Sequence, residues 1–545
     1  MLKCFIHGSV TIMKFSGGKM RIFNINILSL LVTSLFSLSL MAGGTLRLDE
    51  VAIGEADPAK ATDFADGIIM ENVYDALVTE PQGGGPVVGK LAKDWEVSND
   101  GTTITFHLHE GVKFHSGNDF TADDVVYSYE RLMGLKLGWS YLFDGWVKGI
   151  KKIDSHKVQF DLNEPYAPFM SSLVRFYIVD SATLKANETD GDMGQAYLSA
   201  NSAGTGAYSI TAHDPNVETR MAKHNKYFLG IAEMAPNEVI LKYNLDAPTV
   251  RTLIANDEHD ISSNWLPTDV KAAIADSGDK LAKVVSAGGW YFKINTTRAP
   301  LDDVNCRKAL AYALDYDSLV GTFQVTDDIA AGQKARGPIP QGMIGYSEDV
   351  PLVEYNLDKA RDYLSKCKYS GGDLDVTINW IAEVPFEESW ALILQQGAMT
   401  IGYNASVETL PWAVFSENVT KPETTPNISI VAVQAQTPDP DGLIYNMYHS
   451  AAAGTWQSAE WVQDDKIDAM LNAGRTTIDA QKRVEIYEDF QQAIVDMQPD
   501  LFISDLVTVY AMRDEIKAPT LENSAEYGFS TMAQNFSFRL MEVPN

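Results

Sequence analysis

Strand and helix patterns alternate along nearly the whole chain, and this alternation limits the fold more than any other feature of the sequence. Residues 102–109 (TTITFHLH) place an apolar side chain at every second position, which is the period of a half-buried strand. A helix is predicted to begin after Thr121, which can cap the first turn together with Asp124. Further strands are predicted at 158–162, 238–243, 286–295 and 501–511, and further helices at 64–78, 247–256, 303–323 and 479–497. Interleaved strands and helices indicate a mixed α/β or α+β architecture.

The chain is too long for a single hydrophobic core. Its 545 residues predict two or three domain-sized units. No internal repeat and no long linker divides the sequence. We therefore expect the units to share chain segments that cross from one to the other.

Acidic residues dominate the charge. The chain has 43 Lys and Arg against 73 Asp and Glu, a formal net charge of −30. Such a surface repels nucleic-acid phosphates and anionic membranes, so no nucleic acid is expected as a partner. Two interpretations stay open, a solvated acidic shell and attraction of cationic solutes.

The N-terminal segment is predicted to be a signal peptide. Lys14, Lys19 and Arg21 precede the apolar run Ile27–Met41, with no acidic residue nearby. The run is short for a membrane span, although an uncleaved N-terminal anchor is the alternative. We expect cleavage near Ala42 and a periplasmic mature protein.

Two cysteines follow the predicted signal peptide. Cys306 and Cys367 both lie on apolar helix faces and are predicted to be buried. In an oxidising compartment they can form a disulfide, and two buried free thiols are the alternative. No Cys–His spacing typical of a metal site accompanies them.

Catalytic and cofactor motifs are absent from the sequence. It contains no G-x-S-x-G, no G-x-x-x-x-G-K-[ST] and no H-E-x-x-H. His107, His109 and His115 are interpreted as surface residues, and 439–442 as a turn, because the glutamate of a calcium loop is missing. We therefore expect no cofactor, no metal and no enzymatic activity.

Aromatic residues are abundant, with 10 Trp and 23 Tyr. Trp139, Tyr141, Phe143 and Trp146 form one cluster in the sequence. Most of these rings are expected to pack in a core, and some to line a ligand cleft.

Several stretches resemble the family 5 extracellular solute-binding proteins of ABC transporters, the dipeptide, oligopeptide and nickel-binding family. The longest lies within residues 89–132 and comprises GKLA, WEVS and FHLHEGVKFHSGNDFTADDVVYSYERL. His109 stands where the family usually has arginine. Further matches in the same order are EPYAPF (164–169), SAGTGAY (202–208), NTTRAPLDDVNCRKALAYALDYDSLV (295–320) and TPDPDGL (437–443).

The resemblance implies a two-lobed periplasmic binding protein fold with an extra subdomain in the first lobe. The first lobe is expected at 43–285 with a returning tail at 506–545, the extra subdomain at 81–189, and the second lobe at 286–505. A monomer is expected to trap a small solute or short peptide between its lobes and deliver it to the permease subunits of an ABC importer.

The resemblance also suggests ligand-binding residues. Peptide-binding relatives hold the ligand's α-amino group with an aspartate at the position where Gln436 stands, next to Thr437. Either another carboxylate (Asp439, Asp441 or Glu55) takes the amine, or the ligand has none.

Three aromatic residues complete the predicted site, Trp290, Tyr291 and Trp412. A short peptide is the leading solute. The alternatives are an oligosaccharide, an opine or another solute without an amine, and a nickel complex. Delivery of the ligand to a membrane receptor is also compatible with this fold.

Overall fold

The computed structural model describes residues 3–6, 9–16, 19–26, 43–51, 54–81, 85–522, 531 and 533–545. Strands β1 (Lys3–Ile6), β2 (Ser9–Ser16) and β3 (Lys19–Asn26) form a small antiparallel sheet. The apolar run 27–41 and the expected cleavage site at Ala42 lie outside the described residues.

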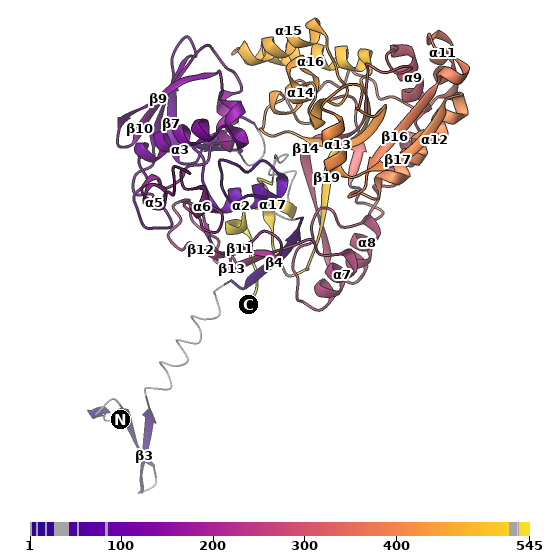
Figure 1. Ribbon diagram of the computed structural model, residues 1–545. Coiled ribbons are helices and arrows are strands. Elements are labelled where there is room, and N and C mark those ends of the chain that lie inside the picture. Colours follow the sequence, from indigo (N-terminus) through magenta and orange to yellow (C-terminus); the bar gives the residue numbers. More distant parts are fainter. Residues whose placement is uncertain are drawn as a thin grey trace.

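Two four-stranded sheets organise the first lobe, which is coloured indigo to magenta in Figure 1. The order β11-β12-β13-β4 joins β11 (Tyr208–Asp214), β12 (Glu218–Lys223), β13 (Glu238–Tyr243) and β4 (Thr45–Glu50). The order β7-β8-β10-β9 joins β7 (Ala92–Val97), β8 (Thr103–Leu108), β10 (Lys157–Leu162) and β9 (Val147–Asp154). Strands β5 (Val78–Thr79) and β6 (Val88–Gly89) pair separately.

Helices cover these sheets. They are α2 (Phe64–Val73), α3 (Ala122–Leu135), η2 (Gly138–Leu142), α4 (Phe169–Ser172), η3 (Leu173–Arg175), α5 (Ser181–Ala186) and α6 (Gln195–Leu198). Helices α7 (Ala247–Ala255) and α8 (Thr268–Asp276) pack against each other instead, and α8 contacts the two long strands described below. The C-terminal α17 (Pro519–Glu522) and η7 (Phe538–Leu540) return to the first lobe (Figure 1).

A six-stranded mixed sheet forms the centre of the second lobe, in the order β15-β19-β14-β18-β16-β17. Its strands are β15 (Gly332–Lys334), β19 (Asp500–Met512), β14 (Lys280–Ile294), β18 (Ile428–Gln434), β16 (Asp375–Ile381) and β17 (Asn404–Leu410). Its helices are α9 (Val304–Ala313), α10 (Tyr316–Gly321), α11 (Leu357–Lys366), η4 (Gly371–Asp373), α12 (Glu387–Ile401), α13 (Trp412–Asn418), α14 (Asp441–Tyr448), η5 (Ser450–Ala452), η6 (Trp456–Ser458), α15 (Asp465–Thr476) and α16 (Ala480–Met497).

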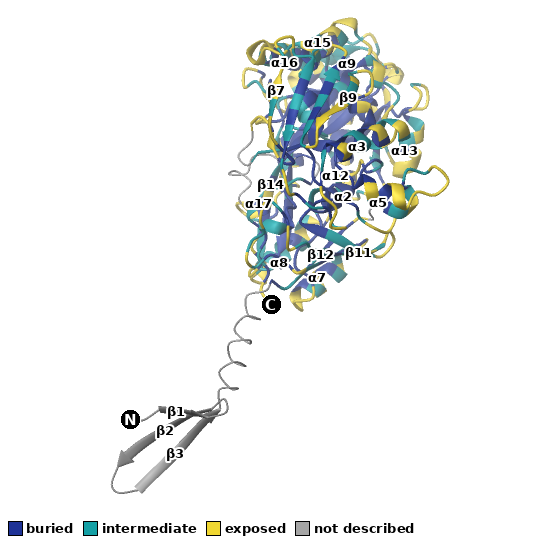
Figure 2. Cartoon of the chain, turned by 90° about the vertical axis from the view of Figure 1, so that its left-hand side faces the viewer, coloured by how far each residue is buried: buried dark blue, intermediate teal, exposed yellow. Residues whose placement is uncertain are grey.

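The antiparallel strands β14 and β19 run through both lobes (Figure 1). Val284 of β14 and Met512 of β19 belong to the hydrophobic core of the first lobe. Farther along the same strands, Phe292 and Leu501 belong to a core of the second lobe. Figure 2 shows buried residues along β14 and exposed residues on the outer helices α5 and α13. One pair of strands thus connects two separate hydrophobic cores.

Two glycines mark the place where this strand pair changes lobe. The register between β14 and β19 shifts between Val285 and Gly289. A Cβ atom on Gly288 would lie 2.2 Å from the carbonyl oxygen of Val433, and one on Gly289 would lie 2.7 Å from the Tyr291 hydroxyl. Glycine thus allows the neighbouring strand to approach closely at Gly288 and leaves room for the Tyr291 side chain at Gly289.

Most predicted elements are confirmed. Strand β8 alternates as expected, β13 has the predicted bounds, and α3 begins after Thr121 with the predicted capping box. The predicted helix 303–323 was wrong, because Leu314 is extended and Asp315 caps a new helix through Ser318 N at 3.0 Å. The predicted helix 64–78 ends at Val73, where the backbone becomes extended.

Of the two alternatives predicted for the cysteines, a disulfide and two free thiols, the structure contains the disulfide. Cys306 and Cys367 are joined, and Cys367 is half-buried rather than fully buried. Together with Asp303 they form the one cluster of potential metal ligands in the described part of the chain, and its two sulfurs are held in the disulfide. Among the described residues, no helix has the length and apolar character needed to span a membrane.

One of the three histidines interpreted as surface residues is more enclosed than expected. His115 packs against His224, with ring centroids 5.2 Å apart, and its Nε2 lies 3.0 Å from the carbonyl oxygen of Gly206. Burial lowers the pKa of His115 to about 4. Its imidazole is therefore neutral at physiological pH.

Candidate functional site

The two lobes meet at Gln436, two residues after the end of β18. The Tyr141 hydroxyl of the first lobe donates a hydrogen bond to Gln436 Oε1, and Asn446 Nδ2 of the second lobe donates to the same oxygen at 3.1 Å. Arg175 Nε of the first lobe donates to the Gln436 carbonyl oxygen at 2.5 Å. We call Tyr141, Arg175 and Gln436 the lobe junction.

A tight turn presents Gln436 to the first lobe. Asp439 N donates to the carbonyl oxygen of Thr437 at 2.7 Å, and Gln436 N donates to that of Gly442 at 3.2 Å. A Cβ atom on Gly442 would lie 2.4 Å from Thr437 Oγ1, so the turn requires glycine there. Thr437, a residue of this turn, is itself buried.

The two aspartates of this turn are paired inside the second lobe. Arg483 donates two hydrogen bonds to the carboxylate of Asp439, both at 2.6 Å. Arg475 donates to the carboxylate of Asp441 at 2.6 and 3.1 Å, and burial raises the pKa of Asp441. Both carboxylates therefore already have arginine partners that fix the turn.

Arg175, at the end of η3, is a buried first-lobe residue that reaches the second lobe. Its Nη2 donates to Thr531 Oγ1 at 2.7 Å, and Thr531 Oγ1 donates in turn to Glu80. Nη1 lies 3.5 Å from the Tyr177 hydroxyl. The nearest ion-pairing oxygen of Glu80 is 3.8 Å from Nη2. Arg175 thus links the C-terminal tail, the first lobe and Gln436.

Two small cavities flank the Arg175 side chain, and each has room for about one water molecule. Both are lined by Arg175 and Tyr177. The first also contacts Leu132 and Phe176, and the second contacts Met70 and Trp139. Ser128 and Arg131 also line the first cavity and Asp63 the second, so the guanidinium has polar and charged neighbours as well as apolar ones.

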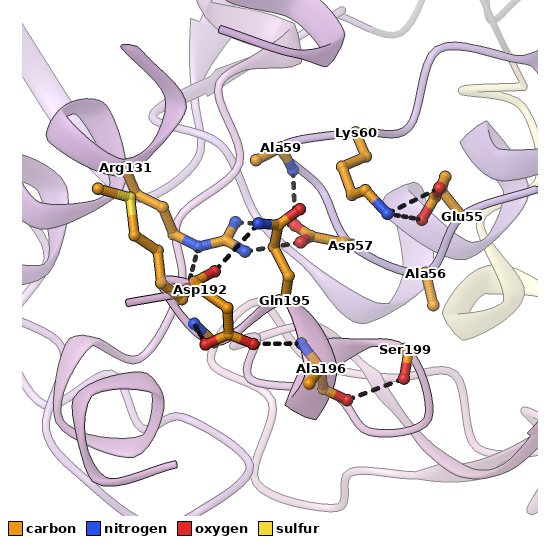
Figure 3. Close-up of polar contacts among 12 residues, drawn as sticks. Glu55, Ala56, Asp57, Ala59, Lys60, Arg131, Asp192, Gln195, Ala196 and Ser199 are labelled. Carbon is orange, nitrogen blue, oxygen red and sulfur yellow. Dashed lines mark hydrogen bonds and ion pairs between the residues drawn. The ribbon is translucent and has the colours of Figure 1, made fainter. Parts of the chain in front are cut away.

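Glu55 lies in the loop after β4, and Figure 3 shows its surroundings. Lys60 Nζ donates to both carboxylate oxygens of Glu55, at 2.9 and 3.0 Å. Close by, Arg131 donates to both oxygens of Asp57, at 2.8 and 2.6 Å (Figure 3). Glu55 and Asp57 thus each have a cationic partner in the first lobe.

The predicted aromatic residues fall into two groups. Trp290 packs against Trp390 in one second-lobe core, with ring centroids 5.0 Å apart, whereas Tyr291 lies in another, near Phe502. Trp412, the first residue of α13, is 37% exposed. Its ring centroid lies 5.3 Å from that of Trp456, and its backbone N donates to Glu383 Oε2 at 2.9 Å.

A second contact between the lobes was not predicted. Trp146 and Tyr166 of the first lobe stack, with ring centroids 4.2 Å apart. The Arg475 guanidinium lies 5.8 Å from the Trp146 ring centroid and 3.1 Å from that of Tyr445. Ala167 N also donates to the carbonyl oxygen of Arg475 at 2.8 Å. The only sequence signal for this contact was the aromatic cluster that contains Tyr141 and Trp146.

Comparison with known proteins gives consistent matches. Residues 86–455, more than half of the chain, match the family described as bacterial extracellular solute-binding proteins, family 5 Middle. A dipeptide-binding protein of Escherichia coli is 26% identical over 491 residues, covering 85% of this chain and 89% of that protein.

Solved structures share the fold with different ligands. A dipeptide-binding protein from Pseudoalteromonas, in complex with Met-Leu, has a TM-score of 0.77 and 21% identity, covering 92% of this chain and 100% of that one. NikZ from Campylobacter jejuni, in complex with Ni(L-His), has a TM-score of 0.78 and 20% identity, covering 91% and 99%. The predicted family and the two-lobed fold are confirmed, and the fold alone does not determine the ligand.

Proposed function

The chain belongs to the bacterial extracellular solute-binding proteins of family 5, and from this premise we propose that it captures a short peptide between its lobes for the permease of an ABC importer. The observation that carries the proposal is Gln436, which accepts hydrogen bonds from both lobes. A solute that contacts both lobes binds the closed form more tightly than the open one and shifts the population toward closure.

We place the first lobe at 43–285 with the tail 506–545, the extra subdomain at 81–189, and the second lobe at 286–505. The change of core along β14 and β19 supports these bounds, since Val284 packs in the first lobe and Phe292 in the second. The hinge then lies at the register shift between Val285 and Gly289.

The proposed ligand contacts are Gln436, Thr437 and the exposed ring of Trp412. Trp290 and Tyr291, whose rings pack in the second-lobe cores, are proposed to support these contacts from the strand that crosses between the lobes. Asp439 orients the turn through Arg483. Glu55 is the first-lobe carboxylate proposed to take a ligand amine, in exchange for Lys60.

A solute without an amine is the second candidate. Gln436 is uncharged, and both aspartates beside it are paired with arginines. A buried ammonium that faced only an amide would lose most of the stabilisation that a carboxylate gives. An oligosaccharide or an opine would avoid this loss, and a nickel complex is the third candidate.

Native mass spectrometry of the purified protein tests the proposal directly. A retained mass that corresponds to a short peptide supports the first candidate, and a retained solute without an amine supports the second. Titration with Met-Leu, followed by tryptophan fluorescence, checks the result in solution. If no peptide is retained and Met-Leu leaves the fluorescence unchanged, the peptide proposal is refuted.

We also propose that the mature protein is monomeric, that it leaves its solute chemically unchanged, and that residues 1–42 act as a signal peptide. Incubation with a bound peptide should return that peptide intact. N-terminal sequencing of the periplasmic protein should begin near residue 43. Turnover of the peptide would contradict the proposal that the solute is left unchanged. Retention of residues 27–41 would contradict the proposed signal peptide.

A further inference from the structure

Asp303, Cys306 and Cys367 bring a carboxylate and two sulfurs together at one edge of the second lobe. Asp303 is the N-cap of α9 and Cys306 lies in its first turn, whereas Cys367 follows the last residue of α11, which lies beside α9 (Figure 1). The ligand atoms of the three residues lie within 4.8 Å of one another. Cys306 is buried, but Asp303 and Cys367 are partly exposed, so the cluster can be reached from solvent.

The disulfide is not the only contact that holds this cluster together. Tyr312 of α9 stacks on Tyr363 of α11, with ring centroids 5.5 Å apart. Lys368 N donates to Asp303 Oδ2 at 3.0 Å and so ties the chain after Cys367 to the start of α9. Because these contacts do not involve sulfur, opening the disulfide leaves both cysteines and the aspartate beside one another.

The carboxylate and one sulfur are oriented by backbone amides, as metal ligands usually are. A carboxylate oxygen can accept two bonds, so Asp303 Oδ2, with its bond from Lys368 N, has capacity for a metal ion. Cys367 Sγ accepts a hydrogen bond from Tyr369 N at 3.4 Å. The Lys368 ammonium is paired with Asp302 at 2.7 Å, which limits its repulsion of a bound cation.

Two thiolates and a carboxylate are a donor set that suits zinc. In a tetrahedral zinc site the ligand atoms are about 3.5–3.8 Å apart, because Zn–S bonds are about 2.3 Å long and Zn–O bonds about 2.0 Å. Once the two sulfurs have separated, small movements of the side chains reach this spacing. The three ligands and Zn²⁺ together carry one negative charge, which the N-terminus of α9 stabilises.

We propose that the reduced form of this protein binds Zn²⁺ through Asp303, Cys306 and Cys367, and that the disulfide closes the site. A dithiol reductant transfers two electrons and two protons to the disulfide and is itself oxidised to a disulfide. Metal binding then releases the two thiol protons and forms two Zn–S bonds and one Zn–O bond. The sequence gave no sign of this site, because 61 residues separate the cysteines. The inference goes beyond solute capture and does not depend on it.

Cobalt spectroscopy of the purified protein tests the inference, because Co²⁺ replaces Zn²⁺ and its bonds to thiolates absorb in the near ultraviolet. Each protein is reduced with dithiothreitol, freed of it under nitrogen and titrated with Co²⁺, with Zn²⁺ as the competitor. The variants are Cys306→Ala/Cys367→Ala and Asp303→Asn, in which asparagine still caps α9. The matched control is Asp315→Asn, the same change at the N-cap of α10.

We expect one equivalent of Co²⁺ to produce the thiolate band in the reduced wild type and in reduced Asp315→Asn. The oxidised wild type and the double cysteine variant should show no band. Asp303→Asn should bind Zn²⁺ at least roughly 10-fold more weakly than Asp315→Asn, because it loses one ligand. Zn²⁺ should also raise the Tm of the reduced wild type more than that of the oxidised protein.

Absence of the band from the reduced wild type overturns the inference, and so does a band that persists in the double cysteine variant. Equal affinities of Asp303→Asn and Asp315→Asn also refute it, because an unfolded reduced chain would bind the metal through its cysteines without preference between the two aspartates. An equal Tm shift in the reduced and oxidised proteins would mean that Zn²⁺ binds elsewhere. None of these results bears on solute capture, so the proposed function is tested separately.

Discussion

The two surfaces that meet at the lobe junction neutralise their charges in different ways. On the second lobe, Asp439 and Asp441 are held by Arg483 and Arg475 of the same lobe. On the first lobe, Arg175 donates to the Gln436 carbonyl and the Thr531 hydroxyl, and its ion-pair partner Glu80 lies 3.8 Å away. The second-lobe surface is therefore prebuilt by short arginine–aspartate pairs, whereas the ion pair at the first-lobe surface is longer and weaker.

The largest expected effect on stability comes from breaking the ion pair of Asp439 and Arg483 on the second-lobe surface. Asp439→Asn leaves the Arg483 guanidinium buried without its carboxylate. We expect a loss of about 3–5 kcal/mol in the free energy of unfolding, measured by urea denaturation. The control is Asp479→Asn, the same chemical change at the N-cap of α16, where asparagine caps equally well. A loss below about 1 kcal/mol for Asp439→Asn would show that this surface is not held by its ion pairs.

The disulfide provides a second test of how the second lobe is stabilised. The Cys306–Cys367 bond closes a loop with a sequence separation of 61 residues. Replacing both cysteines by alanine should lower the free energy of unfolding by about 2–4 kcal/mol, with little change in ligand affinity. A reducing agent should destabilise the wild type by a similar amount and leave the double variant unchanged. A large loss of affinity would mean that the bond shapes the binding surface directly.

Local sequence patterns were sufficient to predict helices and strands of the lobes, but they did not predict the contacts at the lobe junction. The alternation in β8 and the capping box of α3 depend on residues a few positions apart, so the sequence predicts them well. Tyr141 and Gln436 are 295 residues apart, and no local period connects them.

The predicted site shows the same limit. The resemblance to peptide-binding relatives directed attention to Gln436, which does lie at the junction. Arg175 carries no local signal, because its role depends on burial beside Glu80 and on a contact with the other lobe. The break of the predicted helix at Leu314 was missed because Asp315 competes for the backbone as a new cap.

Glu80 should make the stability of the first lobe dependent on pH. Burial raises its pKa from an ordinary value near 4.5 to about 8. A raised pKa in the folded state stabilises the protein below the unfolded pKa, and this stabilisation is lost as the pH rises through 8. Glu80→Gln should therefore reduce the fall in unfolding free energy between pH 5 and pH 8 by about 3 kcal/mol.

Urea denaturation across this pH range gives the measurement for Glu80. Glu258→Gln, an exposed position in the same lobe, is the control and should keep the wild-type profile. Glu50, whose pKa burial also raises to about 8, contributes in every variant and accounts for part of the remaining slope. If Glu80→Gln matches the wild type at every pH, Glu80 is already ionised beside Arg175. The contrast between the two surfaces then disappears.

The smallest expected effect concerns the hydrogen bond from Tyr141 to Gln436. Tyr141→Phe removes one donor across the junction, while Asn446 still satisfies Gln436 Oε1. A net hydrogen bond contributes about 0.5–1.5 kcal/mol, so we expect ligand affinity to fall by roughly 2- to 10-fold through easier opening of the lobes. Small-angle X-ray scattering of the ligand-free protein should show a larger radius of gyration for Tyr141→Phe.

The control is Tyr369→Phe, which removes a hydroxyl that contacts Asp302 within the second lobe. Equal scattering curves for the two variants would assign closure to the stack of Trp146, Tyr166 and Arg475 instead, because that contact would then hold the lobes together without Tyr141.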